Sequence, residues 1–259
     1  MKRKDFILSA TAGIAAATSF LNASESKKTA KKHIVSLSFD DGFAKSHLRT
    51  AEIYEQFGLS ACFNIVSSGS ELNSPFKDKY ANKHPMGDWD LWNELQDRGH
   101  EIMPHGYKHA YLPDIPLEEA KGLIKRCLDD FSRELRGFDP KRSVFNFPYN
   151  YSSPEIEAWL PEVVKAFRTS GGGFNPLPTA DTVKITTEGH GPENCEKKLN
   201  GRLKEFLAGP SGWFVYNLHG LDEEGWGPVR ATYLEKLLAK LVAEPTVRMV
   251  PVGRVLMQA

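Results

Sequence analysis

Short apolar runs alternate with longer amphipathic stretches from residue 33 to near the end of the chain. The runs have the length and composition of β-strands, and we expect strands at 34–39, 61–66, 101–103, 144–147, 182–187, 213–218 and 248–252. The stretches between them favour helices at 48–57, 88–97, 116–136, 153–167, 193–207 and 231–243. Alternation of this kind predicts an α/β fold, in which helices cover a mostly parallel sheet that is either open or closed into a barrel.

Residues that favour helix ends lie at the limits of two of these helices. Asp88 is a good N-cap for the helix at 88–97, and Gly99 follows its end. The longest helix has a proline near its start and Gly137 just after it. Because no internal repeat and no linker interrupts the chain after residue 33, we expect one domain at 33–259.

The N-terminal 32 residues differ in character from the rest. Basic residues at 2–4 precede an apolar, alanine-rich stretch and a suitable cleavage position at Ala23, so we expect an export signal at 1–23 and a disordered leader at 24–32. The apolar stretch is too short and too weak for a stable membrane span. Residues 3–7 are similar to a twin-arginine signal with one arginine replaced by lysine, and an ordinary secretory signal is the alternative. Either signal implies a periplasmic or extracellular protein.

Composition argues against several other classes of protein. Lys+Arg and Asp+Glu each total 33, so the formal net charge is zero, and no basic patch indicates a nucleic-acid partner. Cys62, Cys127 and Cys195 are too widely spaced for a cysteine zinc site, and their odd number leaves no complete disulfide framework.

The residues best suited to chemistry follow the ends of predicted strands. They are Asp40, Asp41, His105, His109, Pro148, Tyr149 and His219. Because the carboxyl ends of parallel strands meet at one rim of a barrel, we expect these residues to lie together in an active site.

Two short motifs carry most of this chemistry. Ser-Phe-Asp-Asp-Gly at 38–42 places Asp40 and Asp41 where a strand meets a glycine, so the two carboxylates leave the turn in different directions. His105 and His109 are four residues apart and can turn two imidazoles toward one ion. Taken separately, the first motif also fits a surface turn and the second a pair of surface histidines.

Taken together, the two motifs predict a metal-dependent hydrolase. One carboxylate and two imidazoles are a sufficient ligand set for a divalent metal with an open position, and the second carboxylate is then a base for water on the ion. The set suits Zn²⁺ best, with Co²⁺, Ni²⁺ or Mn²⁺ as alternatives.

In order and context, these motifs resemble the first two motifs of the polysaccharide deacetylases, the NodB-homology group also called carbohydrate esterase family 4. Residues 89–95 and 99–102 resemble the helix and strand that lead into the histidine motif, and the resemblance extends over about residues 33–255. It implies an irregular (β/α) barrel of about seven parallel strands with outer helices. It also implies removal of N-acetyl or O-acetyl groups from an acetylated carbohydrate polymer or oligosaccharide.

By this resemblance, Asp40 is the catalytic base, and Asp41, His105 and His109 hold the metal. The implied chemistry is attack by an activated water on the acetyl carbonyl, with the oxyanion stabilised by the metal and a backbone donor.

The resemblance assigns the remaining site residues to the substrate and the leaving group. Phe-Pro-Tyr at 147–149 resembles the third motif, in which Pro148 lines the groove and the Tyr149 backbone N–H binds the oxyanion. Leu218 and His219 resemble the final motif, in which the leucine packs on the acetyl methyl group and the histidine is the general acid. A structural histidine is the alternative for His219.

The third motif departs from the family at Asn146, where the family carries an arginine that pairs with the base. Asparagine can orient a carboxylate through a hydrogen bond but supplies no charge. Arg168 is a candidate substitute, with a surface arginine as the alternative. The departure motivates two other hypotheses: a carbohydrate-binding relative with weak or no catalysis, and a hydrolase of non-sugar amides on the same fold.

Overall fold

A computed structural model describes residues 32–71 and 84–259 of the chain. The export signal expected at 1–23 and the leader expected at 24–32, except for Lys32, lie outside these residues. Within the described ranges, no helix is long and apolar enough to cross a lipid bilayer.

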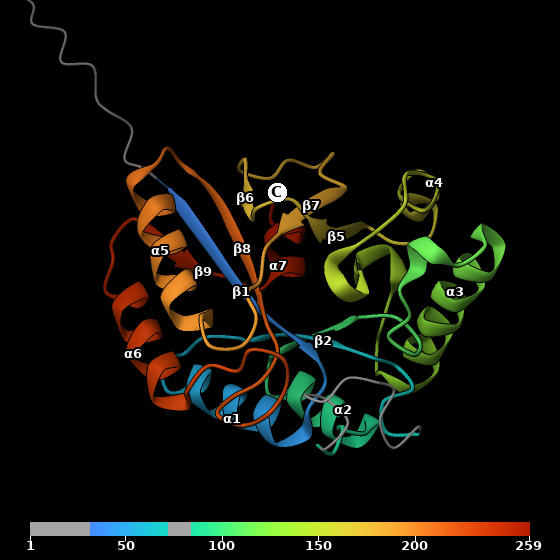
Figure 1. The fold of residues 1–259 in the computed structure, drawn as a ribbon, viewed down its shortest axis with the longest axis horizontal. Coiled ribbons are helices and arrows are strands. Elements are labelled where there is room, and N and C mark those ends of the chain that lie inside the picture. The colour runs from blue at the N-terminus through green and yellow to red at the C-terminus, as the bar shows by residue number, and fades with distance from the viewer. Residues whose placement is uncertain (1–31, 72–83) are drawn as a thin grey trace, which may run out of the picture. The chain divides into compact units, whose positions relative to one another are not determined.

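Strands and helices alternate along most of the described chain (Figure 1). The strands are β1 (His33–Asp41), β2 (Cys62–Ile65), β3 (Glu101–Pro104), β4 (Val144–Asn146), β5 (Ala166–Ser170), β6 (Phe174–Asn175), β7 (Lys184–Thr187), β8 (Gly212–Leu218) and β9 (Val247–Met249). The α-helices are α1 (Ala44–Glu55), α2 (Trp89–Asp97), α3 (Leu117–Glu134), α4 (Pro154–Trp159), α5 (Cys195–Ala208), α6 (Ala231–Val242) and α7 (Val252–Met257). The 3₁₀ helices are η1 (Leu112–Asp114), η2 (Pro140–Arg142), η3 (Pro148–Asn150) and η4 (Leu160–Glu162).

The strands form two sheets that together make the predicted irregular barrel. One sheet has the order β3-β2-β1-β8-β6, with β9 also paired to β1, and the other has the order β4-β5-β7. All pairs are parallel except β6 with β8. Seams lie between β3 and β4 and between β7 and β8, where single contacts join the sheets, such as the Asn217 N–H donating to the Glu188 carbonyl at 3.0 Å. The expectation of about seven parallel strands with outer helices is therefore confirmed.

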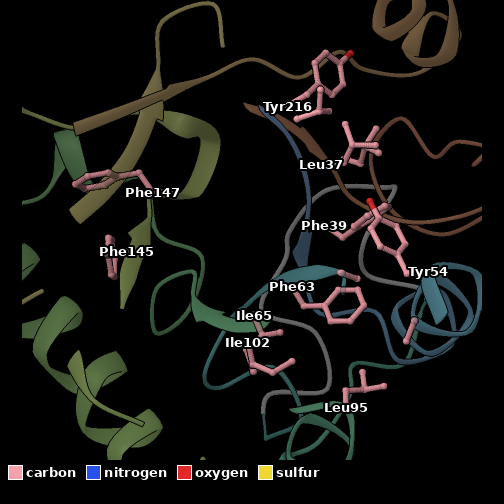
Figure 2. Packing of buried hydrophobic residues seen from close by; sticks show 14 of the residues in the cluster. Leu37, Phe39, Tyr54, Phe63, Ile65, Leu95, Ile102, Phe145, Phe147 and Tyr216 are labelled. Carbon is pink, nitrogen blue, oxygen red and sulfur yellow. The ribbon is translucent and has the colours of Figure 1, made fainter. Parts of the chain in front are cut away.

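The main apolar core lies between the strands and the outer helices. β1 and β8 run side by side (Figure 1), and nearly every residue of both is buried, as expected for strands with packing on both faces. In this core the ring of Phe39 lies 6.1 Å from that of Tyr54 on α1 and 6.2 Å from that of Phe63 on β2 (Figure 2). Helix α1 packs against α6, and α2 packs against β3.

A second, smaller core fills the barrel interior. Its members come from both sheets and from α7, and they are Cys62, Val144, Ala166, Ile185, Trp213, Val215, Val252, Val255 and Leu256. Because strand residues of both sheets pack together in it, this cluster is the apolar layer inside the barrel, and α7 covers one side of the layer.

Two expectations from the sequence are wrong, one for residues 153–170 and one for residues 248–252. The helix expected at 153–167 ends at Trp159, because Pro161 interrupts it and a 3₁₀ turn follows. Residues 166–170 are instead β5, a strand that was not expected. The strand expected at 248–252 is β9, Val247–Met249, and the residues after it form α7.

Candidate active site

The two adjacent carboxylates lie at a sharp bend at the end of β1. Asp41 has a φ of 83° and Gly42 a φ of 105°, both in the left-handed region. A Cβ on Gly42 would lie 3.3 Å from the Trp92 ring, so glycine suits this position in space as well as in conformation. The bend sends Asp40 and Asp41 into different surroundings, as the sequence predicted.

Asp41, His105 and His109 converge on one point. The Nε2 atoms of His105 and His109 lie 3.5 Å and 3.4 Å from the same oxygen, Oδ1 of Asp41. One candidate ligand atom from each residue lies within 4.8 Å of the others. The sequence therefore identified the three members of this cluster correctly, although they come from segments more than sixty residues apart.

The protonation states of the two histidines suit metal binding. His105 Nδ1 lies 2.9 Å from the Asn146 carbonyl, which can only accept, so Nδ1 carries the proton and Nε2 presents its lone pair to Asp41. Burial lowers the pKa of His109 to about 3, although the Asp41 carboxylate opposes the change, so this ring is neutral.

The Asp41 carboxylate fits the same role. Its Oδ1 atom is buried and accepts no hydrogen bond of regular geometry from the described residues. Burial alone would raise the pKa of this carboxyl, but the neighbouring His105 and His109 lower it, so Asp41 is an anion beside two imidazole rings. A buried anionic oxygen that faces two imidazole nitrogens is a fitting ligand set for a divalent metal.

Asp40 has a different environment, in which four donors surround its carboxylate. Arg168 donates from Nη1 to Oδ1 at 2.9 Å and from Nη2 to Oδ2 at 2.5 Å. Asn64 Nδ2 donates to Oδ1 at 2.7 Å, and Asn217 Nδ2 donates to Oδ2 at 3.3 Å. Burial alone would raise the pKa of Asp40, but the Arg168 guanidinium and His105 hold it well below its usual range.

Asn146 does not contact Asp40, so its expected base-orienting role is wrong. Its Nδ2 donates to the carbonyls of Pro104, at 3.3 Å, and Val144, at 3.0 Å. The Asn146 amide thus joins β4 to β3 across a seam, while its own carbonyl fixes the His105 ring.

Arg168 supplies the charge that Asn146 lacks, and it is fully buried rather than on the surface. In the β4–β5 ladder, Arg168 is the residue paired with Asn146. The arginine that the resemblance placed on β4 is therefore found one strand away, beside the same position.

Arg168 and Asp40 belong to a closed ring of hydrogen bonds. Arg168 Nη2 donates to Asn150 Oδ1 at 3.2 Å, and Asn150 Nδ2 donates to Asn217 Oδ1 at 3.0 Å. Asn217 closes the ring through its bond to Asp40. The ring ties η3 and β8 to the carboxylate, and so ties the segment of Tyr149 to the strand that precedes His219.

The other expected site residues lie at the same rim. The Tyr149 ring lies 4.5 Å from the His109 ring, and Tyr149 has a φ of 59° next to the buried Pro148. His219 follows β8 and is half-buried, and it is close enough to lower the pKa of both Asp40 and Asp41. Leu218 is buried in the main core.

The sequence reading missed Asn64, Asn150 and Asn217, although a signal for two of them was present. Asn64 and Asn217 lie two residues after members of the interior cluster, Cys62 and Val215, and residues two apart share one face of a strand. A single amide at such a position within a predicted buried strand indicates a polar layer inside the barrel.

Comparisons with known proteins agree with this geometry. A family model described as polysaccharide deacetylase matches residues 27–177, which is more than half of the chain. No curated protein sequence matches the chain.

Similar solved structures include a Mycobacterium smegmatis protein described as a polysaccharide deacetylase, at 15% identity and a TM-score of 0.65, covering 89% of this chain and 91% of that chain. Peptidoglycan deacetylase PdaC from Bacillus subtilis is similar at 15% identity and a TM-score of 0.57, over 88% of this chain and 90% of that chain. A family 4 acetyl xylan esterase from Clostridium thermocellum, solved with a cobalt ion, is similar at 16% identity and a TM-score of 0.56, over 87% and 91%. At these identities the structural likeness shows the fold. Because the family model covers most of the barrel and the motifs at 38–42 and 105–109, the chain belongs to the polysaccharide deacetylase family and is an enzyme of that family.

Proposed function

We propose that this protein is a metal-dependent deacetylase that removes N-acetyl or O-acetyl groups from a carbohydrate polymer or oligosaccharide. The observation that carries the proposal is the different bonding of two neighbouring carboxylates. Asp40 is held by Arg168, whereas Asp41 faces two imidazoles and accepts no regular hydrogen bond from the described residues at Oδ1.

Asp41, His105 and His109 are the residues that would hold the metal. Zn²⁺ suits one carboxylate and two imidazoles best, and Co²⁺, Ni²⁺ and Mn²⁺ are the alternatives. Bound there, a divalent metal supplies a Lewis acid for the acetyl carbonyl and acidifies a water molecule.

Asp40 and His219 would move the protons. Asp40 is ionised at ordinary pH, because the Arg168 guanidinium and His105 hold its pKa low, and it accepts the proton of the attacking water. The longest of its four hydrogen bonds is the 3.3 Å bond from Asn217 to Oδ2, which is therefore the oxygen best able to exchange a partner. His219 donates a proton to the leaving amine or alcohol.

Tyr149 and Pro148 would bind the acetyl group. The backbone N–H of Tyr149 donates to the developing oxyanion and Pro148 lines the groove, whereas Leu218, expected to pack on the methyl group, is buried in the main core. The ring of bonds through Asn150 supports this assignment, because it fixes the residue that follows Tyr149.

Arg168 answers the argument for the alternative hypothesis, a carbohydrate-binding relative with weak or no catalysis. That alternative depended on the lack of a charge at Asn146, and the buried Arg168 brings the same charge to Asp40 from β5. Charge pairing at the base therefore supports catalysis over carbohydrate binding alone.

For location and substrate, we propose an exported protein whose signal lies at 1–23 and whose catalytic domain is 33–259. Structural neighbours named for peptidoglycan and for acetyl xylan make these two polymers the first substrates to test.

The deciding experiment is acetate release by metal-stripped protein to which zinc, cobalt or nickel is added back. The substrates are acetylated xylo-oligosaccharides, N-acetylglucosamine oligomers and peptidoglycan, with acetylated non-sugar amides as the matched comparison. Release from a carbohydrate that depends on added metal supports the proposal. Metal binding without release from any carbohydrate, or release from the non-sugar amides alone, would overturn it.

A further inference from the structure

Three tyrosines with exposed rings lie together beside the candidate metal site. Tyr149, Tyr111 and Tyr151 are 52%, 39% and 53% exposed. The other described tyrosines are buried or half-buried, for example Tyr54 and Tyr216 in the core. Large aromatic side chains left in water at one place are typical of a binding surface.

The three rings form a continuous row that begins at the metal site. The Tyr149 ring lies 4.5 Å from the ring of His109, a candidate metal ligand, and 5.8 Å from the ring of Tyr111. Tyr111 in turn lies 5.8 Å from Tyr151. We call Tyr149, Tyr111 and Tyr151 the tyrosine row; it leads outward from the point where the acetyl group would react.

The backbone under the row is held in place while the rings are exposed. The Tyr151 N–H donates to the Pro148 carbonyl at 3.3 Å, and Ser152 Oγ lies 2.9 Å from Thr169 Oγ1. Tyr111 precedes η1, whose first residue, Leu112, is buried in the main core. Rings on a fixed backbone lose little conformational freedom when a ligand binds, because each has only two side-chain torsions.

The chemistry of the row fits a sugar. A tyrosine presents an apolar ring face and a hydroxyl at its edge, and a pyranose presents an apolar C–H face with hydroxyl groups around its edge. Neither Tyr111 nor Tyr151 belongs to the ligand or proton-transfer groups, so the two rings extend the site without taking part in the reaction.

We propose that Tyr111 and Tyr151 bind the sugar next to the acetylated one, on the side of the candidate metal site where the tyrosine row lies. This inference rests on the proposed function for the position of the reacting sugar. It adds two points to that function: the side of the site on which the sugar chain continues, and the residues that bind the next sugar.

Binding to oligosaccharides tests the row without requiring hydrolysis. Isothermal titration calorimetry of the zinc-loaded Asp40→Asn protein would compare one-, two- and four-residue members of the N-acetylglucosamine and acetylated xylose series. We expect the affinity to rise with length in one series. The double variant Tyr111→Ala/Tyr151→Ala should lose roughly tenfold of the affinity for the four-residue sugar, as expected when about 1.4 kcal/mol of ring contact is removed. Tyr111→Phe/Tyr151→Phe, which keeps both rings, should retain most of it.

Three results would overturn the inference: affinity that does not depend on length in either series, an alanine double variant that keeps the full gain with length, or an equal loss for the monosaccharide. Circular dichroism and thermal melting of each variant separate these results from misfolding. If the wild-type protein shows no acetate release but the row still binds longer sugars, the proposed reaction fails and the glycan surface stands.

Discussion

Asp40 and Asp41 are consecutive residues of one strand, yet their surroundings are opposite. Asp40 accepts hydrogen bonds from an arginine and two asparagines inside the barrel. Asp41 has a buried oxygen that accepts no regular hydrogen bond from the described residues and faces two histidine rings.

The difference shows how one bend gives two carboxylates two functions. The left-handed conformation at Asp41 turns its side chain out of the barrel layer that contains Asp40. Asp40 is then surrounded by donors that keep it ionised, and Asp41 is left for a cation. The following predictions test this division, from the largest expected effect to the smallest.

The first prediction exchanges each carboxylate for an amide. Asp40→Asn should lower kcat for acetate release about 10²- to 10⁴-fold, the usual effect of losing a general base, while zinc still binds. Asp41→Asn should lose zinc affinity as well as activity, because a charged ligand is removed. Zinc competition with a chelating dye, measured beside kcat, separates the two. Equal loss of zinc affinity in both variants would show that the functions are not divided in this way.

The second prediction removes the counter-charge of Asp40. Arg168→Met should cost about 3–5 kcal/mol of unfolding free energy, because a buried carboxylate is left without its partner. Urea unfolding at pH 7 measures the cost. Arg142→Met, at an exposed position, is the matched control and should stay within about 0.5 kcal/mol of wild type.

A double variant with the arginine on β4 extends this unfolding test. Asn146→Arg combined with Arg168→Met places the charge on the neighbouring strand, and we expect part of the lost unfolding free energy to return. An Arg168→Met protein as stable as the Arg142→Met control would contradict the importance of the buried pair.

The third prediction concerns a histidine on the core side of the same bend. His47 is buried between the rings of Phe63 and Trp92, at 4.9 Å and 5.6 Å, and burial lowers its pKa to about 4, although Asp41 opposes the change. The unfolded chain takes up this proton near pH 6.5, whereas the folded chain does so only near pH 4. Stability is therefore unaffected by His47 above pH 6.5 and falls as the pH decreases, by about 3 kcal/mol at pH 4.

Urea unfolding of wild type and His47→Gln at pH 7.5 and pH 4.5 measures this contribution. The stability lost on acidification should be smaller in the variant. The same loss in both proteins would show that other groups account for the acid sensitivity.

The smallest expected effect is at the ring of hydrogen bonds. Asn150→Gly removes the bonds to Arg168 and Asn217 but tolerates the φ of 59° at this position. We expect kcat to fall about tenfold, the effect of about 1.4 kcal/mol, with a smaller change in KM. Steady-state kinetics on the best acetylated substrate measures the changes in kcat and KM separately. A change in KM alone would mean that Asn150 affects substrate binding and not the orientation of Tyr149.

Much of the site was predictable because its members lie at strand ends. The expected convergence of the motifs at 38–42 and 105–109 is found, since the carboxyl ends of parallel strands meet at one rim whatever their separation in sequence. Arg168 was proposed only as one of two alternatives, because its strand was mistaken for the end of a helix. Pro161 marked the error, since a proline inside a helix removes a backbone hydrogen bond.

The partners of Asp40 could not be read with certainty from one sequence. Asn146 and Arg168 are twenty-two positions apart and become neighbours only through the β4–β5 register, which depends on packing between strands. A motif read along the chain gives the residue at one position but not the residue paired with it.

The position of Arg168 has a consequence for how relatives of this protein are recognised. A search pattern that requires an arginine two residues before the Pro-Tyr pair would reject this sequence at Asn146. A pattern that accepts the arginine at either of two paired strand positions would keep it, because both positions lie at the same place in the barrel. Sequences classified as inactive because they lack the arginine of the third motif can be re-examined for an arginine at the paired position of the neighbouring strand.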